Sequence, residues 1–181
     1  MANLPVSDES SRQDRLYQEA CLSYGAALGR LARAYERRPE EQSDLIQEIH
    51  LALWRSLKGF DGRCSLRTWV YRVAHNAAVS YTIRQRSNSP TFIGLEEIEA
   101  LADTAQGEAA QEQNINLERL LILIQTLSPP DRQLMVLYLE GMDAASIGEI
   151  TGISAGNVAT KIHRIKKILT RDFHQGGKHA N

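Results

Sequence analysis

The sequence predicts an all-α protein made of two small helical domains joined by a flexible acidic linker. Apolar residues recur at helical spacing over most of the 181 residues, and no stretch alternates with period two as a half-buried strand does. The net charge of −1 conceals a strong asymmetry, because residues 88–120 carry one basic and seven acidic side chains while the flanking segments are basic. A chain of this length accommodates one domain or two small ones.

The N-terminal domain is predicted over residues 12–87 and begins with a helix near Tyr17 to Arg37. In a second helix, Asp44 to Lys58, five apolar residues share one face: Leu45, Ile46, Ile49, Leu53 and Leu57. The opposite face carries Asp44, Gln47, Glu48, Leu51, Trp54 and Arg55. Apolar anchors rimmed by charge are typical of interfaces, so this face predicts a protein-docking surface. The alternative is that Trp54 lies at the edge of the core.

A loop with two glycines, Gly59 to Cys64, precedes a third helix that Ser65 is predicted to cap. The predicted buried stripe of this helix is Leu66, Trp69, Val70, Val73, Ala74 and Ala77, and the predicted exposed side is Arg67, Thr68, Tyr71, Arg72, His75, Thr82 and Arg86. Between Asp61 and Glu96 there are five arginines and no acid. Arginines and rings on one face suit a nucleic-acid strand, and a solvated helix face is the alternative explanation of the charge.

The linker is predicted over residues 88–114. It opens with turn-forming residues, Ser87-Asn88-Ser89-Pro90, and continues as a polar segment with some helical character. A flexible linker of about 27 residues has an r.m.s. span of roughly 30 Å. Two domains joined in this way can reach DNA sites more than one turn, ~34 Å, apart.

The C-terminal domain is predicted over residues 115–173, followed by a polar tail, residues 174–181. Ser128, followed by Pro129 and Pro130, begins one helix as its cap, and Gly141 ends it. Asp143 caps a helix from Ala144 to Ile150, and after the turn Thr151-Gly152-Ile153, Ser154 caps a second helix that ends near Arg171. This is a helix-turn-helix pattern, and Gly148 inside its first helix suggests close packing.

The second helix of this motif buries Val158, Ile162, Ile165 and Leu169, and its outer face is basic. Between Glu149 and Asp172 the sequence has five lysines and arginines and no acid. The candidates for base contact are Thr160, Lys161, His163 and Arg164, whereas Lys167 and Arg171 are better placed for phosphates.

Other functional classes are not favoured. The sequence has no phosphate-binding loop, no G-x-G-x-x-G and no H-E-x-x-H, so we predict no enzymatic activity, no cofactor and no metal. Cys21 and Cys64 lack a C-x-x-C pattern and are predicted to be free thiols. The longest apolar run, Leu134 to Leu139, is six residues, and no signal peptide is visible. We therefore expect a cytoplasmic protein without membrane insertion.

Two blocks of this sequence resemble bacterial RNA polymerase sigma factors of the extracytoplasmic-function (ECF) group in the sigma-70 family. DLIQEIHLALWRSLKGFDGRCSLRTWVYRVAHNAA is similar to conserved region 2 of that group, and LSPPDRQLMVLYLEGMDAASIGEITGISAGNVATKIHRIKKIL is similar to region 4. Two blocks in this order, separated by a variable linker, are far more specific than either alone. The family often has a basic residue where Ala159 stands and alanine where Gly148 stands.

The resemblance implies a role for each face. It implies core polymerase binding by the docking face of the second helix, namely Asp44, Gln47, Glu48, Leu51, Trp54 and Arg55. It implies melting of the −10 promoter element by Phe60, Arg63, Ser65, Arg67, Tyr71, Arg72, His75 and Asn76. It implies recognition of the −35 element by Asn157, Thr160, Lys161, His163, Arg164 and Lys167.

The expected function is therefore an alternative sigma factor that binds core RNA polymerase and promoter DNA and is held inactive by an anti-sigma factor. A free-standing helix-turn-helix regulator of duplex DNA is the alternative. The apolar docking face at Leu51 and Trp54, together with a second basic domain, opposes that alternative, because a simple repressor needs neither.

Overall fold

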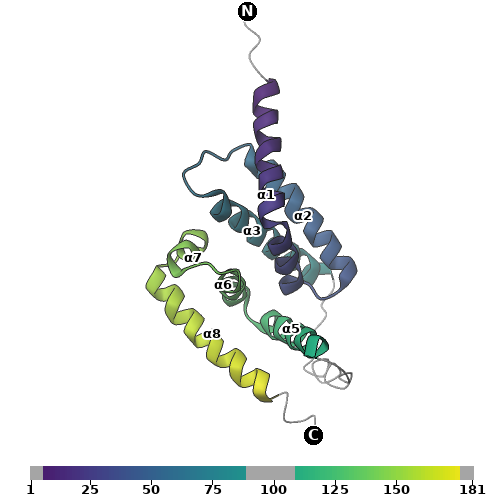
Figure 1. Cartoon of the computed structure of the whole chain (residues 1–181), viewed down its shortest axis with the longest axis vertical. Helices are drawn as coiled ribbons and strands as arrows, with labels where there is room; N and C mark the ends of the chain where they lie inside the picture. Colours follow the sequence, from purple (N-terminus) through teal and green to yellow (C-terminus); the bar gives the residue numbers. More distant parts are fainter. Residues whose placement is uncertain (1–5, 89–108, 176–181) are drawn as a thin grey trace, which may run out of the picture. The chain divides into compact units, whose positions relative to one another are not determined.

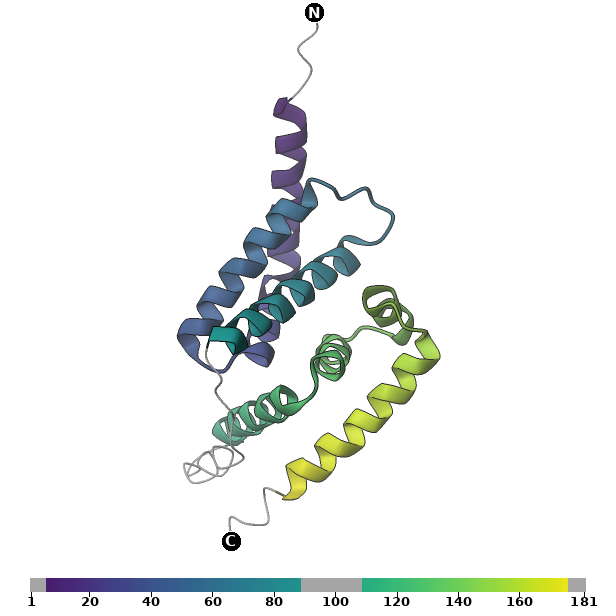
Figure 2. The same cartoon turned by 180° about the vertical axis from the view of Figure 1, so that it is seen from behind.

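The computed structural model describes residues 6–88 and 109–175, with side chains in the ranges 10–85 and 116–174. All elements in these ranges are α-helices, which confirms the predicted fold class (Figures 1 and 2). They are α1 (Val6–Tyr35), α2 (Pro39–Leu57), α3 (Leu66–Asn88), α5 (Ala109–Thr126), α6 (Pro129–Leu139), α7 (Ala144–Thr151) and α8 (Ala155–Gln175). None of these helices combines the length and the apolar character needed to cross a membrane.

Most of the predicted linker, residues 89–108, and most of the predicted tail, residues 176–181, lie outside the described residues. At its edges the linker prediction meets helices, since α3 runs to Asn88 and α5 already begins at Ala109. The first helix also starts earlier than the pattern near Tyr17 indicates, at Val6.

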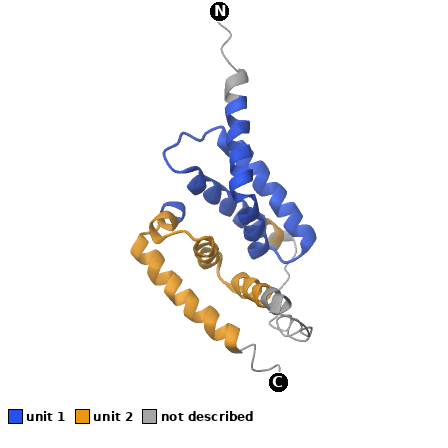
Figure 3. Cartoon of the chain, in the orientation of Figure 1, with its two compact units in different colours: residues 1–83, 149–152 blue, residues 84–148, 153–181 orange. Residues whose placement is uncertain are grey.

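The described residues divide into two compact units (Figure 3). Unit 1 takes in the residues up to Ile83 together with Glu149–Gly152. Unit 2 takes in Arg84 to Gly148 and the residues from Ile153 onward.

Unit 1 is built on an antiparallel contact between α1 and α2. Gln13 donates from Nε2 to the Trp54 carbonyl at 2.7 Å, whereas Tyr17, further along α1, meets His50, which lies earlier in α2. The core stripe of α2 is confirmed at Leu45, Ile49, Leu53 and Leu57, which are fully buried, while Ile46 is half-buried.

The predicted buried stripe of α3 is only partly correct. Val70 and Ala74 are buried, but Leu66, Trp69, Val73 and Ala77 are only half-buried. The remaining buried residues of this helix are Thr68, Tyr71, His75, Ala78 and Tyr81. The buried face of α3 is therefore rotated about the helix axis relative to the predicted one. Rings of α1 pack against it, and Tyr24 lies edge-on to Tyr71 at 6.1 Å between ring centroids.

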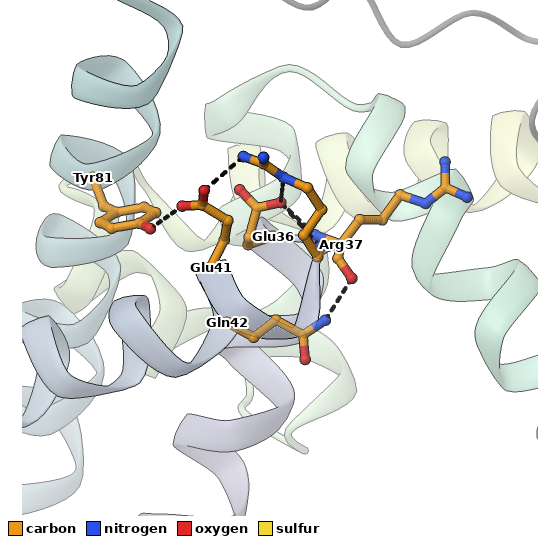
Figure 4. Close-up of polar contacts among 6 residues, drawn as sticks. Glu36, Arg37, Glu41, Gln42 and Tyr81 are labelled. Carbon is orange, nitrogen blue, oxygen red and sulfur yellow. Dashed lines mark hydrogen bonds and ion pairs between the residues drawn. The ribbon is translucent and has the colours of Figure 1, made fainter. Parts of the chain in front are cut away.

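A polar network fixes the α1–α2 corner of unit 1 and ties it to α3 (Figure 4). The Tyr81 hydroxyl donates to Oε2 of Glu41 at 2.5 Å, and Oε1 of the same carboxylate accepts from Arg38 Nη2 at 2.8 Å. Glu36 Oε1 accepts the backbone N–H groups of Arg37 and Arg38 at 2.8 and 3.2 Å. Glu36 thus supplies an acceptor to the backbone of the turn, and Glu41 joins the Arg38 guanidinium of the turn to Tyr81 of α3. Glu41 also lies in the first turn of α2, where the helix dipole favours a negative charge.

In unit 2, α6 begins where the sequence predicts, but not by the predicted mechanism. Ser128 occupies the predicted cap position, but its side chain makes no cap hydrogen bond. Pro129 and Pro130 follow it, and since a cap side chain accepts from the second or third helical residue, the missing N–H of Pro130 leaves that of Asp131 as the one remaining donor for it. The buried Arg132 guanidinium instead donates to the carbonyls of Gln125 and Leu127 at the end of α5.

The helix-turn-helix caps follow the prediction. Asp143 Oδ1 accepts the Ser146 N–H at 2.8 Å, and Ser154 Oγ lies 3.4 Å from the Asn157 nitrogen, a longer contact. Gly141 ends α6 with φ +72°, a conformation that glycine adopts without strain. A Cβ on Gly148 would lie 2.7 Å from the Ile153 carbonyl oxygen, which explains the glycine by close approach of the turn.

Candidate polymerase and promoter interfaces

The predicted docking face of α2 lies on the surface of unit 1. Leu51 and Trp54 are 45% and 40% exposed, and the charged and polar members of this face, Asp44, Gln47, Glu48 and Arg55, are exposed as well. The Trp54 indole N–H donates to Asp14 Oδ1 at 3.2 Å, so α1 orients the ring without covering it. An apolar pair rimmed by carboxylates and an arginine has the composition of a protein interface.

The loop between α2 and α3 is fastened at several points. Arg12 Nη2 donates to the Phe60 carbonyl at 3.0 Å, and the Phe60 ring is buried edge-on against Trp69 at 5.3 Å between centroids. Asp61 accepts the backbone N–H of Arg63 at 3.1 Å. The predicted cap of α3 is confirmed, since Ser65 Oγ accepts the backbone N–H three residues later at 3.0 Å. The contacts of Arg12 and Asp14 carry no sequence signal, because they depend on α1 reaching back to the end of α2.

Two rings of the predicted promoter-facing side of α3 are not on the surface. Tyr71 and His75 are buried, and so is Thr68, so the prediction that they lie on the exposed side of this helix is wrong. His75 Nδ1 lies 3.1 Å from the Tyr35 hydroxyl, and complete burial lowers the His75 pKa to about 3. The imidazole is therefore neutral and belongs to the core, since a buried charge without a partner is costly.

What remains outward on this side is mainly basic. Arg63 and Asn76 are exposed, and Arg67 and Arg72 are half-buried. The Arg67 guanidinium lies over the Tyr71 ring, 5.9 Å from its centroid, so the buried ring still supports a surface cation. The surface is suited to phosphate contact, whereas Tyr71 and His75 provide no exposed stacking platform.

On α8 the predicted recognition residues share a broad outer face. Asn157, Thr160, His163, Arg164 and Lys167 are exposed, Lys161 is half-buried, and the predicted apolar stripe of Val158, Ile162, Ile165 and Leu169 is buried. The distribution of basic side chains at helical spacing fits a recognition helix.

The two edges of this face have different partners on α6. On one edge, Asp131 forms ion pairs with Lys161 and Arg164, at 3.8 Å from Oδ1 and 3.3 Å from Oδ2 respectively. On the other edge, Lys166 Nζ lies 3.3 Å from the Tyr138 hydroxyl and 5.2 Å from its ring centroid. Sequence reasoning did not identify Asp131 as part of this surface, because it follows two prolines at a helix start and looks like an ordinary first-turn acid.

A separate titratable cluster lies between α1 and α2. Both cysteines are free thiols, and Cys21 Sγ lies 3.8 Å from His50 Nδ1, which also contacts the Tyr17 hydroxyl at 3.0 Å. Burial lowers the pKa of His50, and burial together with the Cys21 thiol raises the pKa of Tyr17. Within the described ranges no group of three or more His, Cys, Asp or Glu side chains is arranged to hold a metal ion.

Comparison with known proteins matches both halves of this arrangement. Residues 21–88 match the family Sigma-70 region 2, and residues 117–169 match Sigma-70, region 4. The chain is 30% identical over 135 residues to the ECF RNA polymerase sigma-E factor of Escherichia coli K12, covering 70% of each chain. It is 29% identical over 144 residues to the ECF RNA polymerase sigma factor SigW of Bacillus subtilis, covering 74% of this chain and 75% of the relative.

Two solved structures share the fold. One is CnrH in complex with the cytosolic domain of CnrY, with a TM-score of 0.65, 18% identity and coverage of 93% of this chain and 94% of the other. The second is the sigma factor RpoE in complex with the anti-sigma factor NepR from Bartonella quintana, with a TM-score of 0.67, 18% identity and coverage of 88% and 96%. The chain belongs to the ECF group of the sigma-70 family, the non-enzymatic subunits that direct RNA polymerase in transcription initiation.

Proposed function

We propose that this sigma factor docks on core RNA polymerase through the α2 face, melts the −10 element with the loop after α2 and the surface of α3, and reads the −35 element with α8. The observation that carries the proposal is the presence, on one chain, of an apolar docking face and two basic faces in separate units. A DNA-binding regulator that acts alone needs one basic face. A subunit that joins polymerase to two promoter elements needs all three.

The docking step rests on Leu51 and Trp54, which are exposed although they are apolar. Removing either side chain leaves the buried stripe of α2 intact, so the variants test binding rather than folding. We expect Leu51→Ala and Trp54→Ala to weaken binding to core polymerase. Leu22→Ala is the matched control, because Leu22 is 89% exposed on α1 but belongs to no predicted face. Equal co-purification of all three variants with core polymerase would contradict the assignment of this face.

The melting step uses the arginines that remain outward, Arg63, Arg67 and Arg72, together with Asn76. Burial of Tyr71 and His75 argues that base stacking is not supplied by these two rings in this conformation. Arg67→Ala is expected to slow promoter opening, measured as the fluorescence rise of a base analogue placed in the −10 element. Tyr71→Phe keeps the ring that packs under Arg67 and is expected to open the promoter at the wild-type rate.

The −35 step uses Asn157, Thr160, Lys161, His163, Arg164 and Lys167 on α8. Arg164→Ala is expected to reduce discrimination among −35 sequences by about 1–3 kcal/mol if the guanidinium makes a bidentate contact to a base. The measurement is run-off transcription by polymerase carrying this chain, first across the genome to find its promoters and then on −35 variants of one of them. Tight, specific binding of the chain to promoter duplex without polymerase would favour the free-standing regulator instead.

Regulation by an anti-sigma factor, in the cytoplasm where the template lies, completes the proposal. The two solved structures compared above each contain a bound polypeptide, the cytosolic domain of CnrY in one and the anti-sigma factor NepR in the other. The expected partner is a polypeptide that co-purifies with this chain and blocks its run-off transcription with core polymerase.

A further inference from the structure

We propose that Asp131 is a specificity-determining residue of the −35 contact, although it lies on α6 and not on the recognition helix. Its carboxylate positions Lys161 and Arg164 and offsets part of their charge. The inference rests on the proposed reading of the −35 element by α8 and adds a residue to it.

The geometry places one carboxylate between two cations. Asp131 lies in the first turn of α6, and its side chain is only 20% exposed. Oδ1 is 3.8 Å from Lys161 Nζ and Oδ2 is 3.3 Å from Arg164 Nη2, so each oxygen faces a different cation. Lys161 and Arg164 are three residues apart, which places them on the same edge of α8.

Such a carboxylate has two effects on long basic side chains. It reduces the number of rotamers that Arg164 samples before DNA arrives, which preorganises a guanidinium that has five donors and gives only part of them to one carboxylate. It also lowers the attraction of this edge for phosphates of any sequence. Contacts to bases distinguish one DNA sequence from another, whereas contacts to phosphates do not. A carboxylate that weakens phosphate contacts and orders the base-reading side chains therefore increases selectivity among −35 sequences.

The opposite edge of α8 provides an internal comparison. Lys166 there is paired with the hydroxyl and ring of Tyr138, a partner without formal charge, and so keeps its full attraction for phosphate. Between Glu149 and Asp172 the sequence has no Asp or Glu, so this part of α8 has no carboxylate of its own. In the described part of unit 2, the acid that ion-pairs with Lys161 and Arg164 comes from α6.

The test uses the full chain assembled with core polymerase on a promoter that the wild-type protein transcribes. Asp131→Asn removes the charge at nearly constant shape, and Asp131→Ser removes it with a shorter polar side chain. The measurements are transcript ratios across single base-pair variants of the −35 element, binding to competitor duplex, and the salt dependence of that binding. We expect discrimination to fall about threefold to tenfold in both variants. We also expect competitor DNA to bind more tightly, with a salt slope steeper by about one phosphate contact.

Asp172→Asn is the matched control. It changes the net charge of unit 2 by the same amount, but Asp172 is paired with Arg171 near the end of α8 and not with the proposed base-reading residues. It should leave −35 discrimination unchanged. In the double variant Asp131→Asn with Arg164→Ala, the further loss of discrimination caused by Asp131→Asn should be smaller than in the wild-type background, because part of the effect of Asp131 passes through that guanidinium and only the part through Lys161 remains. A purely structural role would lower the melting temperature without reproducing this non-additivity.

The outcomes separate the inference from the proposed function. If the wild-type holoenzyme does not discriminate among −35 variants, then the proposed role of α8 fails. If the wild type discriminates and both Asp131 variants match it, or match Asp172→Asn, then only the role of Asp131 is overturned. Should Asp131→Asn not fold, Asp131→Ser alone decides between these results.

Discussion

Acidification should destabilise unit 1 through His75. The imidazole is fully buried on α3, its Nδ1 contacts the Tyr35 hydroxyl at 3.1 Å, and its Nε2 has no hydrogen-bond partner among the residues that the structure describes. Protonation would place an unpaired positive charge in this core, and for that reason the pKa of His75 is lowered to about 3 from the ordinary value of 6.5.

The sign and size of the effect follow from these two values. Because the folded pKa is the lower one, the unfolded chain binds more protons between the two, and the free energy of unfolding rises with pH in that window. The contribution is fully present above the unfolded pKa and is lost as pH falls toward the folded pKa. For values of about 3 and 6.5 the linkage relation gives a loss of about 2 kcal/mol between about pH 7 and pH 5.

Urea denaturation followed by tryptophan fluorescence measures this loss in the right part of the molecule, because both tryptophans, Trp54 and Trp69, lie in unit 1. His75→Gln is the control, since glutamine does not titrate but keeps a polar group near Tyr35. The lowered pKa of His50 acts in the same direction in both proteins and cancels in the comparison. A pH dependence that is identical in the wild type and in His75→Gln would refute the assignment.

Substitutions at three further positions test single contacts. Gly148→Ala should lower the stability of unit 2 by about 1–3 kcal/mol, because its Cβ would meet the Ile153 carbonyl oxygen at 2.7 Å. Circular dichroism should then show that the helices melt at a lower temperature than in the wild type. A wild-type melting curve for this variant would mean that the turn relaxes freely. Tyr81→Phe removes the 2.5 Å hydrogen bond to Glu41 and should cost about 1–2 kcal/mol in urea denaturation, with no effect expected on polymerase binding. Ser65→Ala removes the cap of α3 and should cost about 1 kcal/mol, whereas Ser65→Asp should restore most of it; equal stability of both variants would argue against the cap.

Much of the fold could be predicted because helices leave a local record in sequence. The stripe of α2 at Leu45, Ile49 and Leu53 is buried as its spacing indicates, and the caps at Ser65 and Asp143 form as expected. Helix caps and buried stripes depend on residues three or four positions apart, so they can be recognised from the sequence alone. The missing cap hydrogen bond at Ser128 has a local contribution as well, since Pro130 removes one of the two backbone donors that a cap side chain uses.

The candidate interfaces divide along the same line. The sequence by itself determined the helical class, the family, the exposed apolar pair of α2 and the basic character of α8, because each is a property of neighbouring residues or of two blocks that resemble a known family. The tertiary structure alone decided that α3 turns Tyr71 and His75 inward against α1, and that Asp131 reaches Lys161 and Arg164 from α6. Both depend on how helices distant in sequence pack against one another. The helical periodicity of a sequence shows which residues share a face of a helix, but not which face the neighbouring helices cover.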